Sequence, residues 1–352
     1  MLALSKEVDK IWSLCNVKPD EKVVMLRPSV YEYPDLVDEF MSGLCRIGAD
    51  YVLVTLPSKK TLIQEGFGAG KFSSLDIQIL KGADMILSFF TWPSPVPYFT
   101  PPYVEGLNEI LESGTRWLDY MQPNPGINLR RLMPSAAMIE RTMAGVRLME
   151  KADTIRVVSE AGTDLTLSRK GRKGSKETGV VTHPGEWDNW GFGIVATSPI
   201  EESTEGTLVI DTFDYILGLG YKAATEPVKL TFKDGSCEGR IEGGITAKML
   251  ENSLEKANDP RAYLVSHIGW GTHEGAVWHD NALFTMADAE SYMGNMQIAL
   301  GKNTARAPYR HSGLGGKNDV NYHCDIELLN CDFYLDDEQI LEKGKIVHPE
   351  CM

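Results

Sequence analysis

The sequence predicts an α/β domain with a doubly wound parallel sheet, followed by a β-rich α+β domain. Three observations predict this architecture. Aliphatic runs alternate with helical patterns in the first third of the chain, short strand patterns separated by glycine-containing turns dominate the second half, and 352 residues are enough for two domains. We place the first domain at residues 1–135 and the second at residues 136–352.

In the first domain, short aliphatic runs predict parallel strands. The runs lie at residues 21–28, 50–57, 83–90 and 115–121. Apolar residues at helical spacing predict helices over residues 34–49 and 103–114. This β-α-β alternation is typical of a parallel sheet covered by helices on both faces. No GxGxxG or GxxxxGK[ST] motif follows these runs, so the sequence lacks the fingerprints of a nucleotide site.

In the second domain, a helix predicted over residues 138–152 leads into β-rich sequence. Strand patterns lie at residues 153–171, 206–213, 227–241 and 332–347. The KDGS stretch at 233–236 predicts a hairpin turn, because it separates two strand patterns. A helical pattern at 246–259 interrupts the strands. The second domain is therefore expected to be mostly antiparallel.

Composition excludes several classes of partner. The chain carries 49 acidic and 35 basic residues, a formal charge of −14, which repels nucleic acid and anionic membrane surfaces. No segment approaches the roughly 20 apolar residues that span a bilayer, and the N-terminal stretch does not have the pattern of a secretory signal. The six cysteines are scattered without a CxxC pair. We expect reduced thiols in a cytoplasmic protein.

The histidines indicate where metal chemistry would occur. All seven fall in the predicted second domain: His183, His267, His273, His279, His311, His323 and His348. In NYHCDIELLN (321–330), His323 and Asp325 are two residues apart, so in a strand both side chains project from one face. Such a pair can be half of a metal site. It can equally be a histidine and an aspartate that hydrogen-bond each other or a neighbouring strand.

A second stretch offers a third ligand. The YLVSHIG segment (263–269) predicts a buried strand that ends at a glycine-rich turn, which places His267 near the carboxyl end of the strand. His267 can also be a core histidine with satisfied hydrogen bonds. Together, His267, His323 and Asp325 would form the facial triad of two imidazoles and one carboxylate used by non-haem iron(II) oxygenases. That arrangement leaves coordination positions open for substrate and dioxygen.

Several motifs of the second half resemble the aminopeptidase T-like metallopeptidases. They are SPIEESTEGTLVIDTF (198–213), SHIGWGT (266–272), MQIALGKN (296–303) and NYHCDIEL (321–328). The resemblance implies the fold of that family for the second domain. Its members hold two metal ions, but here Ile194 and His267 stand where the family has glutamates and Gln297 stands where it has a histidine. Only His323 and Asp325 match, which leaves ligands for one metal ion, because bridging oxygen ligands hold a metal pair.

The altered ligand set resembles the 2,5-dihydroxypyridine 5,6-dioxygenase group, which shares the aminopeptidase fold but binds a single iron(II). HPGEWDNWG (183–191) is also similar to that group. The resemblance implies an extradiol-type reaction in which both atoms of dioxygen enter the ring of a dihydroxylated N-heteroaromatic, with 2,5-dihydroxypyridine giving N-formylmaleamate. It implies iron(II) as cofactor, a small aromatic substrate and dioxygen as partners, and a homo-oligomer.

If the resemblance holds, other residues become candidates. His183 and His311 are candidate catalytic bases, since imidazole accepts a proton near neutral pH. The candidate substrate-binding residues are Glu186, Trp190, Arg310 and Tyr322. The histidines and Trp190 have plainer alternatives: a loop histidine that caps a carbonyl, and a tryptophan in ordinary packing. The predicted first domain contains no histidine, so a base from that side would be a tyrosine such as Tyr120.

Two other functions remain open at this level. The first is a metal-dependent aminopeptidase, which should hold two ions and release amino acids without oxygen. The second is a metal-free binding or assembly protein that kept the fold. The presence of a histidine at position 267 in addition to the His323 and Asp325 pair favours a working metal site over the remnant of a lost one. Random loss of ligands would rarely create a new ligand.

Overall fold

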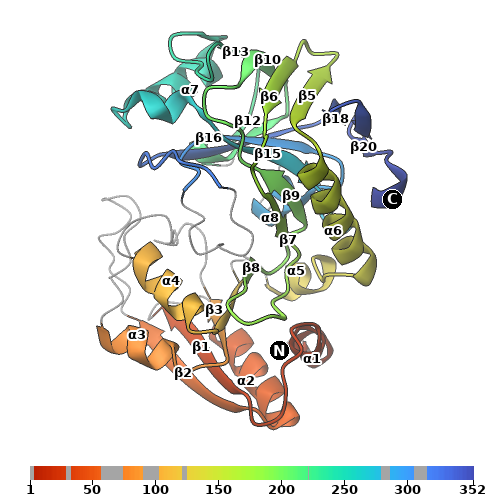
Figure 1. Cartoon of the computed structure of the whole chain (residues 1–352). Coiled ribbons are helices and arrows are strands. Elements are labelled where there is room, and N and C mark those ends of the chain that lie inside the picture. The colour runs from red at the N-terminus through yellow and green to blue at the C-terminus, as the bar shows by residue number, and fades with distance from the viewer. Residues whose placement is uncertain are drawn as a thin grey trace. The chain divides into compact units, whose positions relative to one another are not determined.

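The computed structural model describes residues 4–28, 33–56, 74–89, 103–120, 125–220, 222–278, 286–304 and 315–352. The chain forms two compact units (Figure 1). The first comprises the described residues up to Pro134 together with Glu177–Phe192. The second comprises Ser135–Lys176 and the described residues from Gly193 onward.

The first unit contains a five-stranded parallel sheet, which confirms the predicted fold class. The strand order is β2-β1-β3-β4-β8, and each neighbouring pair is parallel. The strands are β1 (Lys22–Pro28), β2 (Asp50–Leu56), β3 (Met85–Phe89), β4 (Arg116–Tyr120) and β8 (Trp187–Asn189). The residues of β3 and β4 are fully buried, as expected for strands that helices cover on both faces.

Helices cover both faces of this sheet (Figure 1). They are α1 (Ser5–Leu14), α2 (Pro34–Ile47), α3 (Ser74–Leu80), α4 (Tyr103–Glu112) and α5 (Pro125–Arg131). On one face, Leu80 of α3 and Leu107 of α4 join a hydrophobic cluster with Leu26 of β1. On the other, the ring of Phe40 in α2 contacts that of Phe89 in β3, with centroids 5.4 Å apart. The sheet is therefore doubly wound.

Helix α2 shows how local sequence sets its limits. Pro34 occupies the first turn, where the missing N–H is not needed for helix hydrogen bonding. The helix ends at Gly48, which has a φ of 84° and donates its N–H to Leu44 and Cys45. A left-handed residue of this kind terminates a helix, and glycine adopts it without steric cost.

The fifth strand, β8, was not expected from the local pattern. No strand is predicted over HPGEWDNWG, but β8 pairs in parallel with β4, and Trp187 lies opposite Trp117. Trp117 N–H also donates to the carbonyl of Glu186 at 2.8 Å. His183 therefore lies in the first unit, contrary to the prediction that all seven histidines share the second domain. The prediction that the first unit lacks an imidazole is wrong for the same reason.

The second unit contains two sheets that are almost entirely antiparallel among the described strands. One has the order β14-β13-β10-β6-β5-β18-β19-β20. Its strands are β5 (Thr154–Ser159), β6 (Asp164–Ser168), β10 (Glu205–Ile210), β13 (Val228–Phe232), β14 (Ile241–Glu242), β18 (Cys331–Leu335), β19 (Glu338–Glu342) and β20 (Lys345–Ile346). The other has the order β12-β11-β17-β16-β15-β9-β7. Its strands are β7 (Gly174–Glu177), β9 (Ile194–Thr197), β11 (Tyr215–Ile216), β12 (Lys222–Ala223), β15 (Val265–Gly271), β16 (Met296–Gly301) and β17 (His323–Leu328).

One hydrophobic core joins the two sheets of the second unit. It contains Val157 and Phe333 from the eight-stranded sheet and Ile298 and Ile326 from the seven-stranded sheet. Helices α6 (Ala136–Lys151) and α7 (Ile245–Glu255) pack residues into the same core, and α8 (Met286–Ser291) precedes β16. Short 3₁₀ turns lie at Leu217–Leu219, Pro260–Tyr263 and Pro349–Cys351. The β-rich second domain of the prediction is confirmed.

Two local predictions in this unit, the helix over residues 138–152 and the KDGS turn at 233–236, are also confirmed. Ser135 caps α6, because its side chain accepts the N–H of Met138 at 2.9 Å. The KDGS turn joins β13 to the following segment, with Lys233 paired to Ser236. Asp234 and Gly235 at its centre have φ values of 51° and 84°, as a two-residue hairpin turn of type I′ requires.

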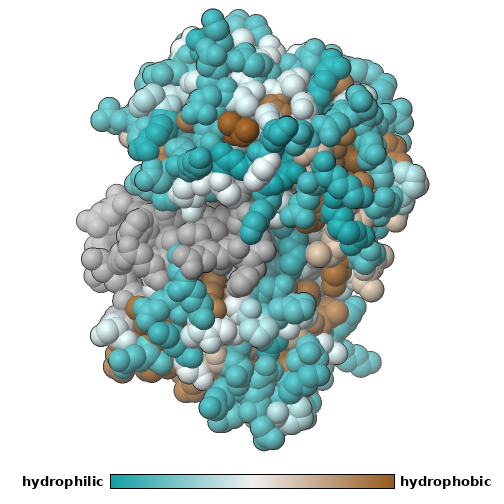
Figure 2. All heavy atoms as spheres, in the orientation of Figure 1, coloured by the Kyte–Doolittle hydropathy of each residue, from teal (hydrophilic) through white to brown (hydrophobic). Residues whose placement is uncertain are grey.

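Surface and thiol properties agree with the composition. Hydrophilic residues predominate on the face shown in Figure 2, with hydrophobic residues in smaller areas between them. Within the described ranges, every helix is too short or too polar to cross a bilayer. All six cysteines are free thiols.

Candidate metal centre

Strand β17 carries two of the three predicted ligands. His323 and Asp325 are the first and third residues of the strand, and their side chains are 21% and 17% exposed. His323 Nε2 lies 3.0 Å from Asp325 Oδ1. The prediction that the two side chains share one face of a strand is confirmed.

The neighbouring strand β16 leaves room on that face. In the antiparallel register, Ala299 lies opposite Asp325 and Gly301 lies opposite His323. Residues directly opposite each other in such a pair point to the same face. Because β16 presents only a methyl group and a glycine there, side chains from the strands on either side can meet across it.

The third ligand, His267, reaches this face through a β-bulge in β15. Val265 pairs with Leu300 of β16 and His267 pairs with Ala299, so two steps on β15 correspond to one step on β16 and Ser266 is the extra residue. In a regular strand, His267 would share the apolar face of Val265, since side chains alternate with a period of two. The bulge turns His267 to the face that carries Asp325.

The strand does not end where the sequence predicts. It continues to Gly271 and pairs with β9, so His267 is the third of seven residues rather than a residue at the carboxyl end. The glycines belong to the strand because β9 passes close to them: a Cβ added to Gly269 would lie 1.8 Å from the carbonyl oxygen of Val195. The glycine-rich stretch here allows close strand packing.

Three ligand atoms converge on the polar face. His267 Nε2 lies 3.4 Å from Asp325 Oδ1, and the rings of His267 and His323 are 5.4 Å apart between centroids. One ligand atom from each of the three residues lies within 4.8 Å of the others. His267 is fully buried, whereas the other two are partly accessible. These residues form a possible two-histidine, one-carboxylate metal site.

The hydrogen bond on the far side of the His323 ring supports this interpretation. His323 Nδ1 lies 2.9 Å from the carbonyl oxygen of Lys302, which can only accept a hydrogen bond. Nδ1 therefore carries the proton, and in a neutral ring Nε2 has a lone pair directed at Asp325. A lone pair facing a carboxylate at 3.0 Å requires a proton or a cation between them. The donor set, two imidazoles and a carboxylate, suits a divalent transition metal.

The polar face also carries Glu327, which was not among the predicted site residues. Glu327 follows Asp325 by two residues, is fully buried, and accepts a hydrogen bond from Asn295 Nδ2 at 2.5 Å. Burial raises the pKa of Glu327 well above its ordinary value, and repulsion from Glu290, Asp325 and Asp214 adds to the effect. The alternation of His323, Asp325 and Glu327 in HCDIE was the available signal. Gln297 lies directly opposite Glu327 on β16.

The predicted base His183 lies in the segment before β8. Its side chain is 81% exposed, and Nδ1 lies 2.9 Å from the hydroxyl of Thr182. Glu186 Oε2 accepts the backbone N–H groups of Thr182 and His183 at 2.7 and 3.0 Å and lies 3.6 Å from the imidazole. Glu186 thus shapes the turn that carries His183. The roles of both residues in catalysis and substrate binding stay predictions.

Trp190 and Tyr322, two of the predicted substrate-binding residues, pack against other side chains of their own units. Trp190 is 1% exposed, and its ring stacks on Tyr120 with centroids 5.1 Å apart, which is the packing alternative considered above. Tyr322 packs against the core of the second unit, and its hydroxyl lies 3.2 Å from that of Ser253 in α7. Burial raises the pKa of Tyr322. The roles of Trp190 and Tyr322 in substrate binding stay predictions.

The remaining predicted residues, His311 and Arg310, lie outside the described residues.

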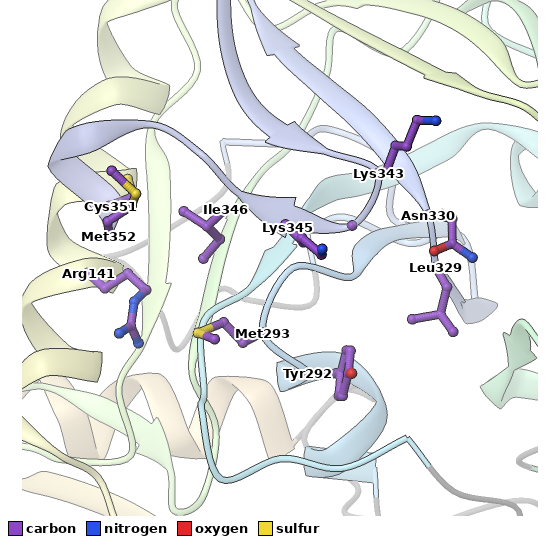
Figure 3. A pocket seen from close by; sticks show the side chains of 11 residues that line it. Arg141, Tyr292, Met293, Leu329, Asn330, Lys343, Lys345, Ile346, Cys351 and Met352 are labelled. Atoms are coloured by element: carbon purple, nitrogen blue, oxygen red, sulfur yellow. The ribbon is translucent and has the colours of Figure 1, made fainter.

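A cavity of about 510 Å³ in the second unit lies elsewhere (Figure 3). Arg141, Tyr292, Lys345 and Ile346 are among the residues that line it, and none of the three metal-ligand candidates is. Figure 3 shows Lys345 and Met293 near the middle of the labelled side chains. The chemistry of the ligand cluster, and not the size of a cavity, therefore identifies the candidate site.

Comparison with known proteins agrees with this geometry. Residues 3–348 match the family described as NicX, 2,5-dihydroxypyridine 5,6-dioxygenase. The chain is 36% identical over 360 residues to 2,5-dihydroxypyridine 5,6-dioxygenase of Pseudomonas putida KT2440, covering 99% of this chain and 97% of that protein.

Two solved structures show the same fold. The structure of 2,5-dihydroxypyridine dioxygenase from Pseudomonas putida KT2440 superposes with a TM-score of 0.84 at 29% identity, covering 99% of this chain and 98% of that one. AmpT from Thermus thermophilus gives a TM-score of 0.67 at 17% identity, covering 98% and 100%. The second likeness confirms the predicted aminopeptidase T-like fold. The full-length match in sequence and structure shows that the chain belongs to the 2,5-dihydroxypyridine 5,6-dioxygenase family.

Proposed function

We propose that this protein is a mononuclear iron(II) dioxygenase that opens the ring of 2,5-dihydroxypyridine to give N-formylmaleamate. The observation that carries the proposal is the convergence of His267, His323 and Asp325 on one face of the seven-stranded sheet. Family membership supports the dioxygenase chemistry and the substrate. The ligand set supports iron, because two histidines and one carboxylate on a single face form the triad of non-haem iron(II) oxygenases.

The three side chains would hold iron(II) through His267 Nε2, His323 Nε2 and a carboxylate oxygen of Asp325. Iron(II) bound there would supply the one-electron chemistry that dioxygen needs and would bring dioxygen and the ring together. The carboxylate lowers the positive charge of the site, and the bond from His323 Nδ1 to Lys302 keeps the ligand nitrogen directed at it. Burial of His267 excludes water from one side.

Proton transfer from a ring hydroxyl requires a base. His183 and His311 are the predicted bases, and Glu186, Trp190, Arg310 and Tyr322 the predicted substrate contacts. Of these, His183 has the accessibility that a proton acceptor needs, since its side chain is 81% exposed. We also propose that the protein acts in the cytoplasm as a homo-oligomer; the six free thiols support a reducing compartment.

Anaerobic reconstitution tests the proposal. Metal-free protein is titrated with iron(II), and oxygen uptake is then followed with 2,5-dihydroxypyridine together with the loss of ring absorbance. We expect one iron per chain, one dioxygen consumed per ring opened, and N-formylmaleamate as product. Zinc(II) provides the control, because it has no redox chemistry and should support no oxygen uptake.

Other results would support the alternatives. Two metal ions per chain with release of amino acids from peptides in the absence of oxygen would identify an aminopeptidase. A protein that takes up no metal at all would fit the binding or assembly function. Either result would refute the dioxygenase proposal.

A further inference from the structure

The carbonyl oxygen of Lys302 lies between the two strands that supply the imidazoles. It accepts the hydroxyl of Ser266 at 2.6 Å and His323 Nδ1 at 2.9 Å. A carbonyl oxygen has two lone pairs, so these two donors satisfy it fully. Ser266 is also the extra residue of the bulge that turns His267 to the polar face. One backbone oxygen thus accepts the hydrogen bond that orients His323. The same oxygen is bonded to Ser266, the bulge residue beside His267.

Asn318 holds the chain on both sides of Lys302. Its side-chain Nδ2 donates to the backbone carbonyl of Gly301 at 2.8 Å, and its backbone carbonyl accepts the N–H of Asn303 at 2.9 Å. Asn318 N–H donates in return to Asn303 Oδ1 at 2.7 Å. Lys302 N–H itself donates to Tyr322, the residue before His323, at 2.7 Å. The peptide that presents the Lys302 carbonyl is therefore fixed at each end.

A buried ion pair fixes Asn303 in turn. Glu201 accepts Asn303 Nδ2 at 3.1 Å and the N–H of Lys317 at 2.7 Å, and it pairs with Arg172 at 2.5 Å. The side chains of the pair are about one tenth exposed. Gly316 packs so closely that an added Cβ would lie 2.0 Å from Asn303 Cγ. Polar groups this buried and this fully paired hold one geometry.

We propose that Ser266 and Asn318 are positioning residues of the metal centre, which act through the Lys302 carbonyl on the orientation of His323. The inference rests on the proposed function, because it assumes that His323 binds metal through Nε2. Asn318 fixes where the carbonyl lies, and Ser266 ties that carbonyl to the bulge beside His267. Loss of such an outer hydrogen bond commonly weakens metal binding by about 10–100-fold.

Metal affinity tests the inference without reference to turnover. Metal-free wild type, S266A, N318A and N318D are titrated anaerobically with iron(II) and separately with cobalt(II), whose visible spectrum reports the ligand geometry. Both Asn318 variants remove the Nδ2 donor to the carbonyls of Gly301 and Arg261 and keep the backbone bonds between Asn318 and Asn303. N318D keeps the side-chain shape but adds a negative charge, whereas N318A adds none, so weakening in both variants points to the lost hydrogen bonds. We expect affinity about 10–100-fold weaker in each variant. The affinity loss of the S266A/N318A double variant should be smaller than the sum of the two single losses, because both changes act on the position of the Lys302 carbonyl.

Thr163→Val is the matched control. Thr163 is a buried residue directly before β6; its hydroxyl donates to the carbonyl of Val209 at 3.3 Å and accepts the N–H of Val209 at 2.9 Å. T163V should therefore lower the free energy of unfolding while leaving metal affinity and the cobalt spectrum unchanged.

The outcomes separate the inference from the function on which it rests. Wild-type affinity and an unchanged cobalt spectrum in S266A and N318D would overturn the inference and leave the proposed function intact. Equal weakening in T163V would also overturn it, since general destabilisation would then be the cause. A wild-type chain that binds neither metal would overturn the proposed function itself.

Discussion

The two faces of the seven-stranded sheet in the second unit differ although the same strands build both. On one face of β17, Cys324, Ile326 and Leu328 join the hydrophobic core between the sheets. On the other, His323 and Asp325 form the candidate metal centre with His267. Side chains of a strand alternate between its faces with a period of two. The six residues of β17 therefore contribute to the hydrophobic core on one face and to the candidate metal centre on the other. Substitutions on the two faces should therefore have different effects.

The largest expected effect is on the polar face. Asp325→Asn keeps the shape of the side chain but removes the negative charge from the ligand set. We expect iron(II) affinity at least about 100-fold weaker, more than for an outer hydrogen bond, with oxygen uptake lost in proportion. Anaerobic iron titration and the oxygen electrode measure the two quantities. The same substitution at exposed Asp337 is the control. A D325N variant that binds iron with wild-type affinity would exclude Asp325 as a ligand.

The apolar face should respond in stability instead. Ile326→Ala removes a fully buried side chain from the core, and we expect the free energy of unfolding to fall by about 2–5 kcal/mol. Urea denaturation measures the loss. Iron affinity of the folded protein should stay within about threefold of wild type, because Ile326 points away from the ligands. If I326A weakened iron binding as strongly as D325N, the separation of the two faces would be wrong.

The smallest expected effect is on stability in acid, at the buried ion pair of Glu201 and Arg172 beside Asn303. Burial alone would raise the pKa of Glu201, but hydrogen bonds from Lys317 N–H and Asn303 and the charge of Arg172 outweigh it and lower the pKa. Because the folded state favours the ionised form, this stabilisation is present above about pH 4.5, the ordinary value, and is lost as pH falls through the lowered pKa.

E201Q should therefore show a shallower loss of stability in acid than wild type. The difference in slope is bounded by one proton, at most about 1.4 kcal/mol per pH unit. Urea denaturation at a series of pH values between neutral and acidic measures it. Curves that stay parallel for the two proteins would show that Glu201 does not titrate with an altered pKa.

Much of the fold could be predicted because its elements are locally patterned. The aliphatic runs at β1 through β4 and the helices α2, α4, α6 and α7 lie close to the predicted ranges. The short strand β8 could not be recognised, because three residues carry too little pattern and its pairing with β4 joins segments about 70 residues apart. The error had a functional consequence, since it assigned His183 to the wrong unit.

The candidate site divides in the same way. His323 and Asp325 could be paired from sequence because i and i+2 positions of a strand share a face. His267 could be proposed as a residue type but not placed, since its face depends on the bulge at Ser266. The packing of Trp190 and the contact of Tyr322 with Ser253 involve distant residues, so no local pattern indicated them.

The sequence by itself determined the strands, their alternation of polar and apolar residues, and the kinds of ligand available. Only the tertiary structure decided that three strands distant in the chain would bring His267, Ala299 and Asp325 into one row. The physical reason is that strand register and bulges are set by pairing between segments, and one extra residue exchanges the two faces of a strand. A local pattern specifies which residues alternate, whereas the pairing specifies where each face points.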